Sequence, residues 1–147
     1  MNPAVERIGD YSVAVIPTPA VPEFWDSVAT GFSAALHNSP GDTEFSDVIE
    51  ALLEGSLGLV ILADGEGPQA AACVEEISGA RGNWLNLPFL WANGLAPLSR
   101  LFNFVEEYAY QHGYIGVKWV TTNDRAPVLA KRRGYQQRLV EYVKEFP

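Results

Sequence analysis

WLNLPFLWANGLAPLSRLFNFVEEYAYQHGYIGVKWVTT, residues 84–122, determines the architecture of this chain. Trp84–Leu90 has the composition of a strand, and Pro88 within it predicts a bulge or an opening of the sheet. Leu98–Gln111 carries apolar residues at helical spacing along one stripe, and Gly113 ends that helix. The following residues, Tyr114–Thr122, are rich in strand-forming side chains. A strand, a helix and a second strand predict a parallel pair joined by a right-handed crossover.

The flanking sequence predicts further elements of both kinds. The expected strands are Tyr11–Ile16, Leu57–Ala63, Gln69–Ile77 and, at the end, Tyr135–Phe146. The Asp64–Pro68 segment has hairpin-turn chemistry. The expected helices are one from Glu23 to about Asn38, one capped by Thr43 and ended by Gly55, and one over Ala126–Arg133, while Pro17–Pro22 is expected to be a connector. This order predicts a single α/β (α+β) domain over residues 1–147, with a mixed central sheet flanked by helices.

Composition supports one globular domain and excludes several function classes. The chain has 147 residues, of which 48% are hydrophobic and 19% charged. One cysteine, Cys73, cannot form an internal disulfide, and with only two histidines we expect no metal site. No apolar run approaches the ~18–20 residues of a membrane helix, and the first ten residues do not resemble a secretion signal. We therefore expect a cytoplasmic protein that does not associate with membranes.

The net charge of −8 conceals a division along the chain. Residues 1–112 hold three basic and fifteen acidic side chains, whereas residues 113–147 hold seven basic and three acidic ones. Overall acidity argues against nucleic-acid binding, because neutralising phosphates dominates that affinity. The acidic part favours attraction of a cationic molecule, and the basic end favours a small phosphorylated ligand or is simply a solvated helix face.

The glycine before the long helix predicts an anion site. A glycine-containing turn before the helix leaves its first N–H groups unpaired and aimed outward, and the helix dipole adds positive potential there. Phosphate is the usual ligand of such a terminus. A single glycine before a helix is, however, more often only a turn.

Two local patterns resemble those of the GNAT acetyltransferase superfamily. The first has proline, glycine, an aliphatic residue and alanine at the family's spacing, in Pro88, Gly94, Leu95 and Ala96. The second has asparagine, alanine, an aliphatic residue and a glycine–aromatic pair, in Asn123, Ala126, Leu129, Gly134 and Tyr135. The two patterns occur in the family's order, and the likeness runs from about Leu57 to the end. It implies a GNAT-like acyl-CoA N-acyltransferase fold.

The resemblance also implies acetyl-CoA as the cofactor. Strand backbone near Leu87 and Phe89 would pair with pantetheine, backbone N–H groups around Gly94–Arg100 would hold the pyrophosphate, and Asn123 would orient pantetheine or the next helix. The implied cofactor-binding residues are Leu87, Phe89, Trp91, Gly94, Leu95, Ala96, Ser99, Arg100 and Asn123.

Two positions depart from the family pattern. Trp91 stands where a polar or cationic side chain is usual, and Ala130 stands where many members have the tyrosine that protonates the leaving thiolate. Trp91 at the mouth of the cleft would block the cofactor or stack on its adenine. Glu75 and Glu76 are the candidate bases, and as neighbours on a strand they face opposite sides of the sheet. Acetyl transfer is therefore expected to be slow or absent.

The other reactive side chains favour structural interpretations. Cys73 lies among alanines and valine and is interpreted as a buried small residue. His112 ends a helix and is interpreted as a capping or surface residue rather than as a base. His37 lies in a loop and is likewise not interpreted as a base.

Two functions from different classes remain open. The first is an N-acetyltransferase acting on a small-molecule or peptide amine. The second is a non-catalytic binding or assembly protein on the same fold, such as a bacteriophage virion component, acting through aromatic side chains near the cleft. These aromatics are Trp84, Phe89, Trp91, Phe102, Phe104 and Tyr108. Packing in the core is the simpler interpretation of these side chains. A homo-oligomer is compatible with either function.

Overall fold

A computed structural model describes residues 4–36, 44–120, 126–138, 142 and 144–147. The strands are β1 (Ala4–Ile8), β2 (Tyr11–Ile16), β3 (Gly58–Asp64), β4 (Gly67–Gly79), β5 (Gly82–Ala92) and β6 (Gly116–Trp119). The helices are a 3-10 turn η1 (Thr18–Ala20) and α1 (Val21–Leu36), α2 (Phe45–Glu54), α3 (Leu95–Gln111) and α4 (Ala126–Arg132).

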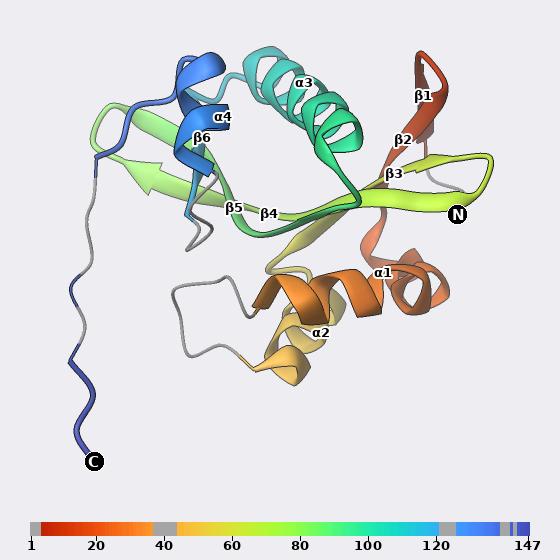
Figure 1. Cartoon of the computed structure of the whole chain (residues 1–147), viewed down its shortest axis with the longest axis horizontal. Helices are drawn as coiled ribbons and strands as arrows, with labels where there is room; N and C mark the ends of the chain where they lie inside the picture. Colours follow the sequence, from red (N-terminus) through yellow and green to blue (C-terminus); the bar gives the residue numbers. More distant parts are fainter. Residues whose placement is uncertain (1–3, 37–43, 121–125, 139–141, 143) are drawn as a thin grey trace.

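The six strands form one mixed sheet in the order β1-β2-β3-β4-β5-β6. Neighbouring strands are antiparallel except for β5 and β6, which are parallel and are joined through α3. Figure 1 shows α1 and α2 on one side of this sheet and α3 and α4 on the other. The predicted mixed sheet flanked by helices, with a parallel pair around the long helix, is therefore confirmed.

Each face of the sheet has its own apolar core. Alternate residues of β4 point into different cores. Ala71 and Cys73 pack toward α1 and α2, and Ala70 and Ala72 pack toward α3. This separation follows from the two-residue period of a strand. All four side chains are fully buried, and their small size lets helices approach both faces of the strand closely.

Some helix ends agree with the sequence prediction and others do not: α3 ends at Gln111 as expected but begins at Leu95 rather than at Leu98. Gly55 ends α2 in the left-handed conformation, with φ of 84°. Thr43, the expected cap of α2, lies outside the described residues, and the observed N-cap is Glu44, whose N–H donates to the Asp47 carboxylate at 3.2 Å. Helix α1 begins at Val21, so the expected connector contributes Pro22 to its first turn, where proline is tolerated.

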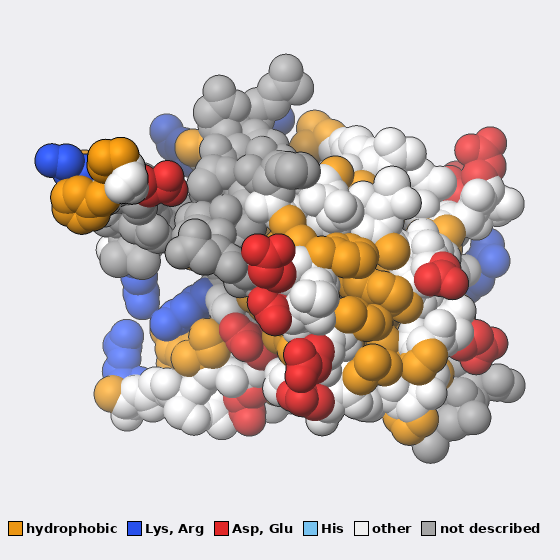
Figure 2. Space-filling model, turned by 90° about the horizontal axis from the view of Figure 1, so that it is seen from below, with side chains coloured by type: hydrophobic (Ala, Val, Ile, Leu, Met, Phe, Trp, Pro, Cys, Tyr) orange, Lys and Arg blue, Asp and Glu red, His pale blue; other side chains and the backbone are white. Residues whose placement is uncertain are grey.

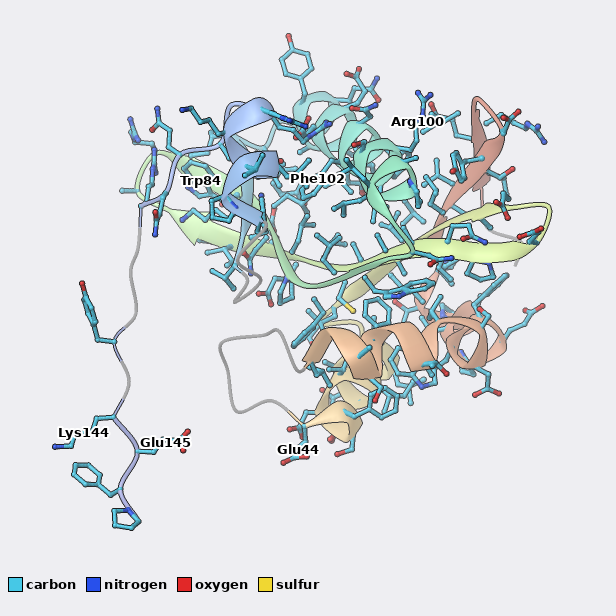
Figure 3. The ribbon with its side chains drawn as sticks, in the orientation of Figure 1. Glu44, Trp84, Arg100, Phe102, Lys144 and Glu145 are labelled. Atoms are coloured by element: carbon cyan, nitrogen blue, oxygen red, sulfur yellow. The ribbon has the colours of Figure 1, made fainter. Side chains whose placement is uncertain are left out.

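Two predictions at the ends of the chain need correction. The sequence interpretation missed β1, which forms a hairpin with β2 across Gly9 and Asp10. The prediction of a final strand over Tyr135–Phe146 is wrong for the described residues, because Tyr135–Arg138 and Lys144–Pro147 do not form a strand. Figure 3 shows Lys144 and Glu145 well away from the sheet, and Figure 1 shows the C-terminal end there as well. Without a neighbouring ladder, strand propensity alone does not make a strand.

Candidate functional site

The turn between β5 and α3 is held by a pair of hydrogen bonds to β4. The N–H of Asn93 donates to the carbonyl of Gln69 at 2.7 Å, and its side-chain Nδ2 donates to Gln69 Oε1 at 2.9 Å. Gly94 follows with φ of 105°, a conformation that other residues rarely adopt. These contacts fix the position at which α3 begins.

The first turn of α3 presents its N–H groups to solvent. Leu95 and Ala96 are exposed, and the first intrahelical bond runs from the N–H of Leu98 to the carbonyl of Gly94 at 3.3 Å. Pro97 has no N–H to leave unpaired. A Cβ on Gly94 would meet no atom of the described residues within 4 Å, so the turn is uncovered at this position in that part of the chain. An anion can therefore approach these donors and the positive end of the dipole.

Strand β5 loses its β6 partner beside this turn. Parallel pairing covers Trp84–Leu87 and ends at the Leu87–Trp119 pair, whereas β5 continues to Ala92 against β4. On the β4 side, Leu87 and Pro88 oppose the single residue Val74, which is a β-bulge. The predicted opening of the sheet at Pro88 is thus confirmed, and beyond it β5 has an open edge toward β6 in the described part of the chain.

The residues named for cofactor binding lie around this opening on different faces. Leu87 is buried toward α3, while Phe89 and Trp91 pack on the side of α1. Ser99 is half-buried. Arg100 is exposed and points away from the sheet, whereas its near neighbour Phe102 points into the core (Figure 3). Asn123 lies outside the described residues, and cofactor contacts by the other residues stay a prediction.

Trp91 packs against helix α1. A Cβ on Gly31 would fall 2.2 Å from Cδ2 of its ring, so the indole lies directly on the helix backbone. Half-buried there, Trp91 faces away from α3 and from the N–H groups at the start of that helix. The condition for a plug or an adenine-stacking platform, a Trp91 exposed at the mouth of the cleft, is not met.

The structure also divides the expected aromatic cluster. Phe89 and Trp91 belong to the α1 side. Phe102 is buried on the α3 side and contacts the rings of Trp119 and Tyr135, with centroids 5.4 and 5.8 Å away. The burial of Phe102 and the packing of Phe89 and Trp91 agree with the simpler expectation of core packing, and the group is split because alternate strand residues point to opposite faces.

The two candidate bases occupy opposite faces, as predicted. Glu75 lies on the α1 side, half-buried, and accepts a hydrogen bond from Asn86 Nδ2 at 2.8 Å. Glu76 is exposed and accepts from Asn83 Nδ2 at 3.1 Å. Only Glu75 therefore combines partial burial with a neutral donor that holds one carboxylate oxygen and leaves the other available.

Cys73 and His112 have the structural roles expected from the sequence. Burial, with a smaller contribution from the charge of Glu75, raises the pKa of the Cys73 thiol, so the thiol is a poor nucleophile. The ring of His112 lies at the end of α3, with Nδ1 2.8 Å from the carbonyl of Tyr108. His37 lies outside the described residues.

Sequence reasoning missed a polar cluster that joins α3 to the end of α4. The Arg133 guanidinium pairs with Glu106 at 2.7 Å and donates to Asn103 Oδ1 at 2.7 Å. The hydroxyl of Tyr135 donates to Glu106 at 2.7 Å, and burial together with this bond raises the pKa of Tyr135. A tyrosine so engaged does not replace the acid absent at Ala130. The spacing of Glu106 from Arg133 along the sequence gave no signal of the contact.

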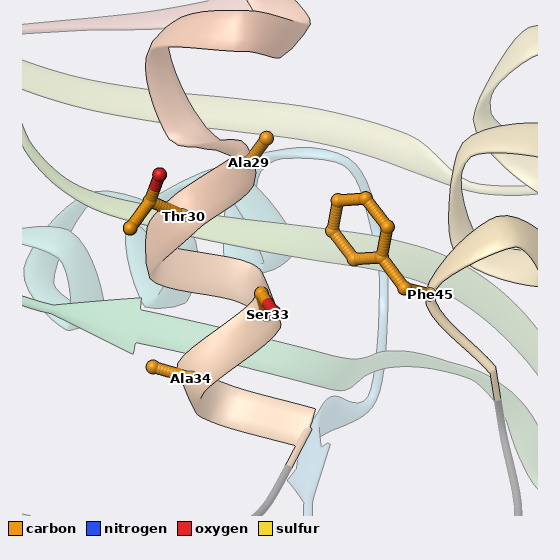
Figure 4. A pocket seen from close by; sticks show the side chains of 5 residues that line it. All are labelled: Ala29, Thr30, Ser33, Ala34 and Phe45. Atoms are coloured by element: carbon orange, nitrogen blue, oxygen red, sulfur yellow. The ribbon is translucent and has the colours of Figure 1, made fainter.

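The hollows of the surface lie elsewhere. One, of about 470 Å³, lies between α1 and the start of α2 and is lined by Ala29, Thr30, Ser33, Ala34 and Phe45 (Figure 4). A second lies between α3, β6 and the residues after α4. Neither of these two hollows is lined by the β5–α3 turn. The described residues contain no group of three metal-ligating side chains, and none of their helices is long and apolar enough to cross a membrane.

Solved acetyltransferases share this arrangement. A GNAT family acetyltransferase from Staphylococcus aureus matches with a TM-score of 0.65 at 10% identity, covering 93% of this chain and 99% of its own. A predicted acetyltransferase from Clostridium acetobutylicum, solved with acetyl-CoA, matches with a TM-score of 0.63 at 10% identity, covering 92% and 96%. An aminoglycoside acetyltransferase from an uncultured soil metagenomic sample, solved with sisomicin, matches with a TM-score of 0.67 at 8% identity, covering 94% and 97%.

Sequence comparison adds nothing to these structural matches. Neither a protein-family model nor a curated protein matches the chain. Identities this low establish the fold alone, and the chain has the fold of the GNAT acetyltransferases.

Proposed function

We propose that this chain is an acetyl-CoA-dependent N-acetyltransferase. The observation that carries the proposal is the meeting of two features in one place: the open edge of β5 beyond Leu87 and the unpaired N–H groups at the start of α3. The strand edge offers backbone groups to pantetheine, and Leu95 and Ala96 offer N–H groups to the pyrophosphate. Bound acetyl-CoA supplies the acetyl group as a thioester.

Glu75 is the base in this proposal. An amine must lose a proton as it attacks the thioester carbonyl, and a carboxylate on the α1 side of the sheet can accept that proton. Asn86 orients the carboxylate through its 2.8 Å hydrogen bond. Glu76 lies on the other face of the sheet, where it accepts a hydrogen bond from Asn83, and it takes no part in the proposed proton transfer.

The leaving thiolate has no dedicated acid. Ala130 cannot donate a proton, and Tyr135 is committed to Glu106. A general acid contributes about 10²–10⁴ in rate, so turnover limited to protonation by water is slow.

A free-thiol release assay on small amines tests the assignment of the base. Glu75→Gln is expected to lower kcat by about 10²-fold or more, while the matched Glu76→Gln stays near wild type. Cys73 contributes little background, because its thiol is buried. Equal turnover in both variants would remove Glu75 from the mechanism. If acetyl-CoA neither binds nor turns over, the non-catalytic alternative is the better account.

A further inference from the structure

The row of side chains that contains Glu75 ends in a cation. Glu75 pairs opposite Asn86, and Asn86 pairs opposite Lys118, so the three residues share one face of β4, β5 and β6. Because neighbouring strands lie about 4.8 Å apart, the Lys118 backbone is roughly 10 Å from that of Glu75. A molecule of moderate length can contact both ends of this row.

The adjacent row holds an indole that supports the cation. Trp84 pairs with Ile77 and with Gly116. A Cβ on Gly116 would lie 2.5 Å from the Trp84 ring, and one on Gly79 would lie 3.0 Å from its Nε1, so only glycines let the ring lie across the neighbouring strands. The ring is half-buried and is therefore fixed in place while part of it meets solvent.

Two positive charges gather over this ring. Lys118 Nζ is 4.5 Å and Arg138 Cζ is 5.4 Å from the Trp84 ring centroid, which are cation–π distances. Both side chains are exposed. Within the described ranges of the chain the ion pair is Arg133 with Glu106, so neither Lys118 nor Arg138 is neutralised by a described carboxylate. Figure 2, seen from the side of α1 and α2, shows Lys and Arg side chains toward the edges of the molecule and several Asp and Glu side chains near its middle.

We propose, resting on the proposed acetyltransferase function, that the acceptor is an amine that also carries an anionic group. Its amine lies at Glu75, its carboxylate or phosphate lies at Lys118 and Arg138, and the linking atoms lie against Trp84. The negative charge of the rest of the chain does not oppose this arrangement, because charges beyond about 8–10 Å are largely screened at physiological salt. Local cations therefore determine which acceptor binds.

Matched amines test the proposal in the thiol-release assay. Hexylamine, 6-aminohexanoate and 6-aminohexyl phosphate share a six-carbon chain and differ in the anionic group. We expect kcat/KM to be about tenfold or more higher for one or both anionic amines than for hexylamine, as charge-assisted contacts allow. A higher value for the carboxylate or for the phosphate identifies the group that binds.

Charge-removing variants locate the anion site. In Lys118→Met and in Arg138→Met the preference for the anionic amine is expected to fall toward one through a raised KM. The matched control Lys131→Met removes one exposed charge from α4 and is expected to retain the preference. Circular dichroism of each variant reports on folding.

The outcomes separate this inference from the function on which it rests. Turnover that is equal for all three amines and unaffected by Lys118→Met overturns the anionic acceptor and leaves the transferase function standing. If acetyl-CoA does not bind, the function fails. In that case, calorimetry with 6-aminohexyl phosphate and with 6-aminohexanoate tests whether the anion site exists. Binding of either compound supports the site, and the absence of heat for both overturns it.

Discussion

Gly31 is the residue of helix α1 on which the Trp91 indole of strand β5 lies. Adding a methyl group there places Cβ 2.2 Å from Cδ2 of the Trp91 indole, and neither the helix backbone nor the packed ring can yield easily. We expect Gly31→Ala to lower the free energy of unfolding by about 1–3 kcal/mol, as overpacking does. Urea denaturation measures it.

Gly65 provides the matched control for this prediction. A Cβ on Gly65 would meet nothing within 4 Å, so Gly65→Ala is expected to change stability by less than about 0.5 kcal/mol. Combining Gly31→Ala with Trp91→Leu should recover part of the loss. Equal stability of Gly31→Ala and Gly65→Ala would show that the indole does not lie on the helix.

Cys73 makes the stability depend on pH in the alkaline range. Burial first, and the charge of Glu75 second, raise the pKa of its thiol in the folded protein, while the unfolded thiol ionises near its ordinary value of about 8.5. A folded pKa above the unfolded one gives stability that is complete below the unfolded value and declines as the pH rises above it. The decline is about 1.4 kcal/mol per pH unit, or about 2 kcal/mol by pH 10.

Urea denaturation at pH 7 and pH 10 checks this dependence. Cys73→Ala removes the ionising group, so its loss between the two pH values is expected to be smaller than that of wild type by about 2 kcal/mol. The stability that Cys73→Ala loses with its sulfur atom is the same at both pH values, so it cancels when the two losses are compared. If both proteins lose the same free energy of unfolding between pH 7 and pH 10, the thiol is accessible to solvent and its pKa is not raised.

At the scale of elements, the start of α3 is the part that the function requires. Gly94→Asp places a carboxylate before the N–H groups of Leu95 and Ala96, where a phosphate is proposed to bind. Gly94→Ala is the matched control, because it carries the same backbone strain at φ 105° without the charge. Calorimetry with acetyl-CoA is expected to show at least about tenfold weaker binding for Asp than for Ala. Equal affinities, with unchanged circular dichroism, would place the pyrophosphate elsewhere.

Elements were predictable from the sequence where several signals coincide. The β5–α3–β6 unit combines strand composition, a glycine turn, a helical stripe and a closing Gly113, and its order and parallel pairing are confirmed. Its bounds differ, because α3 begins three residues before the expected Leu98 and β6 begins at Gly116 rather than at Tyr114. Strand β1 contains polar residues on an edge and is marked mainly by the Gly9–Asp10 turn, which was overlooked. The segment Tyr135–Arg138 has strand-forming composition, yet the Tyr135 side chain is used in the contact with Glu106 and no neighbouring strand pairs with the segment.

At the scale of the whole molecule, the sequence predicted the place of the candidate site but not the direction of its side chains. Pro88 and Gly94 mark the opened strand and the helix start, which are backbone features that a local pattern reports. Which of Glu75 and Glu76 faces the α1 side depends on the register of β4 across a bulge at Leu87 and Pro88, and only the assembled sheet fixes that register. Trp91 packs on Gly31, a contact between residues 60 positions apart that no spacing reveals.

Titration of acetyl-CoA by isothermal calorimetry tests the central claim, that the opened edge of β5 and the start of α3 form a cofactor site. We expect saturable binding of one acetyl-CoA per chain, with a dissociation constant in the range of about 1 μM to 1 mM that is usual for enzyme substrates. Gly94→Ala should retain most of that affinity. No detectable heat at millimolar acetyl-CoA from a folded protein would contradict the account and leave the chain as an acetyltransferase fold without the cofactor.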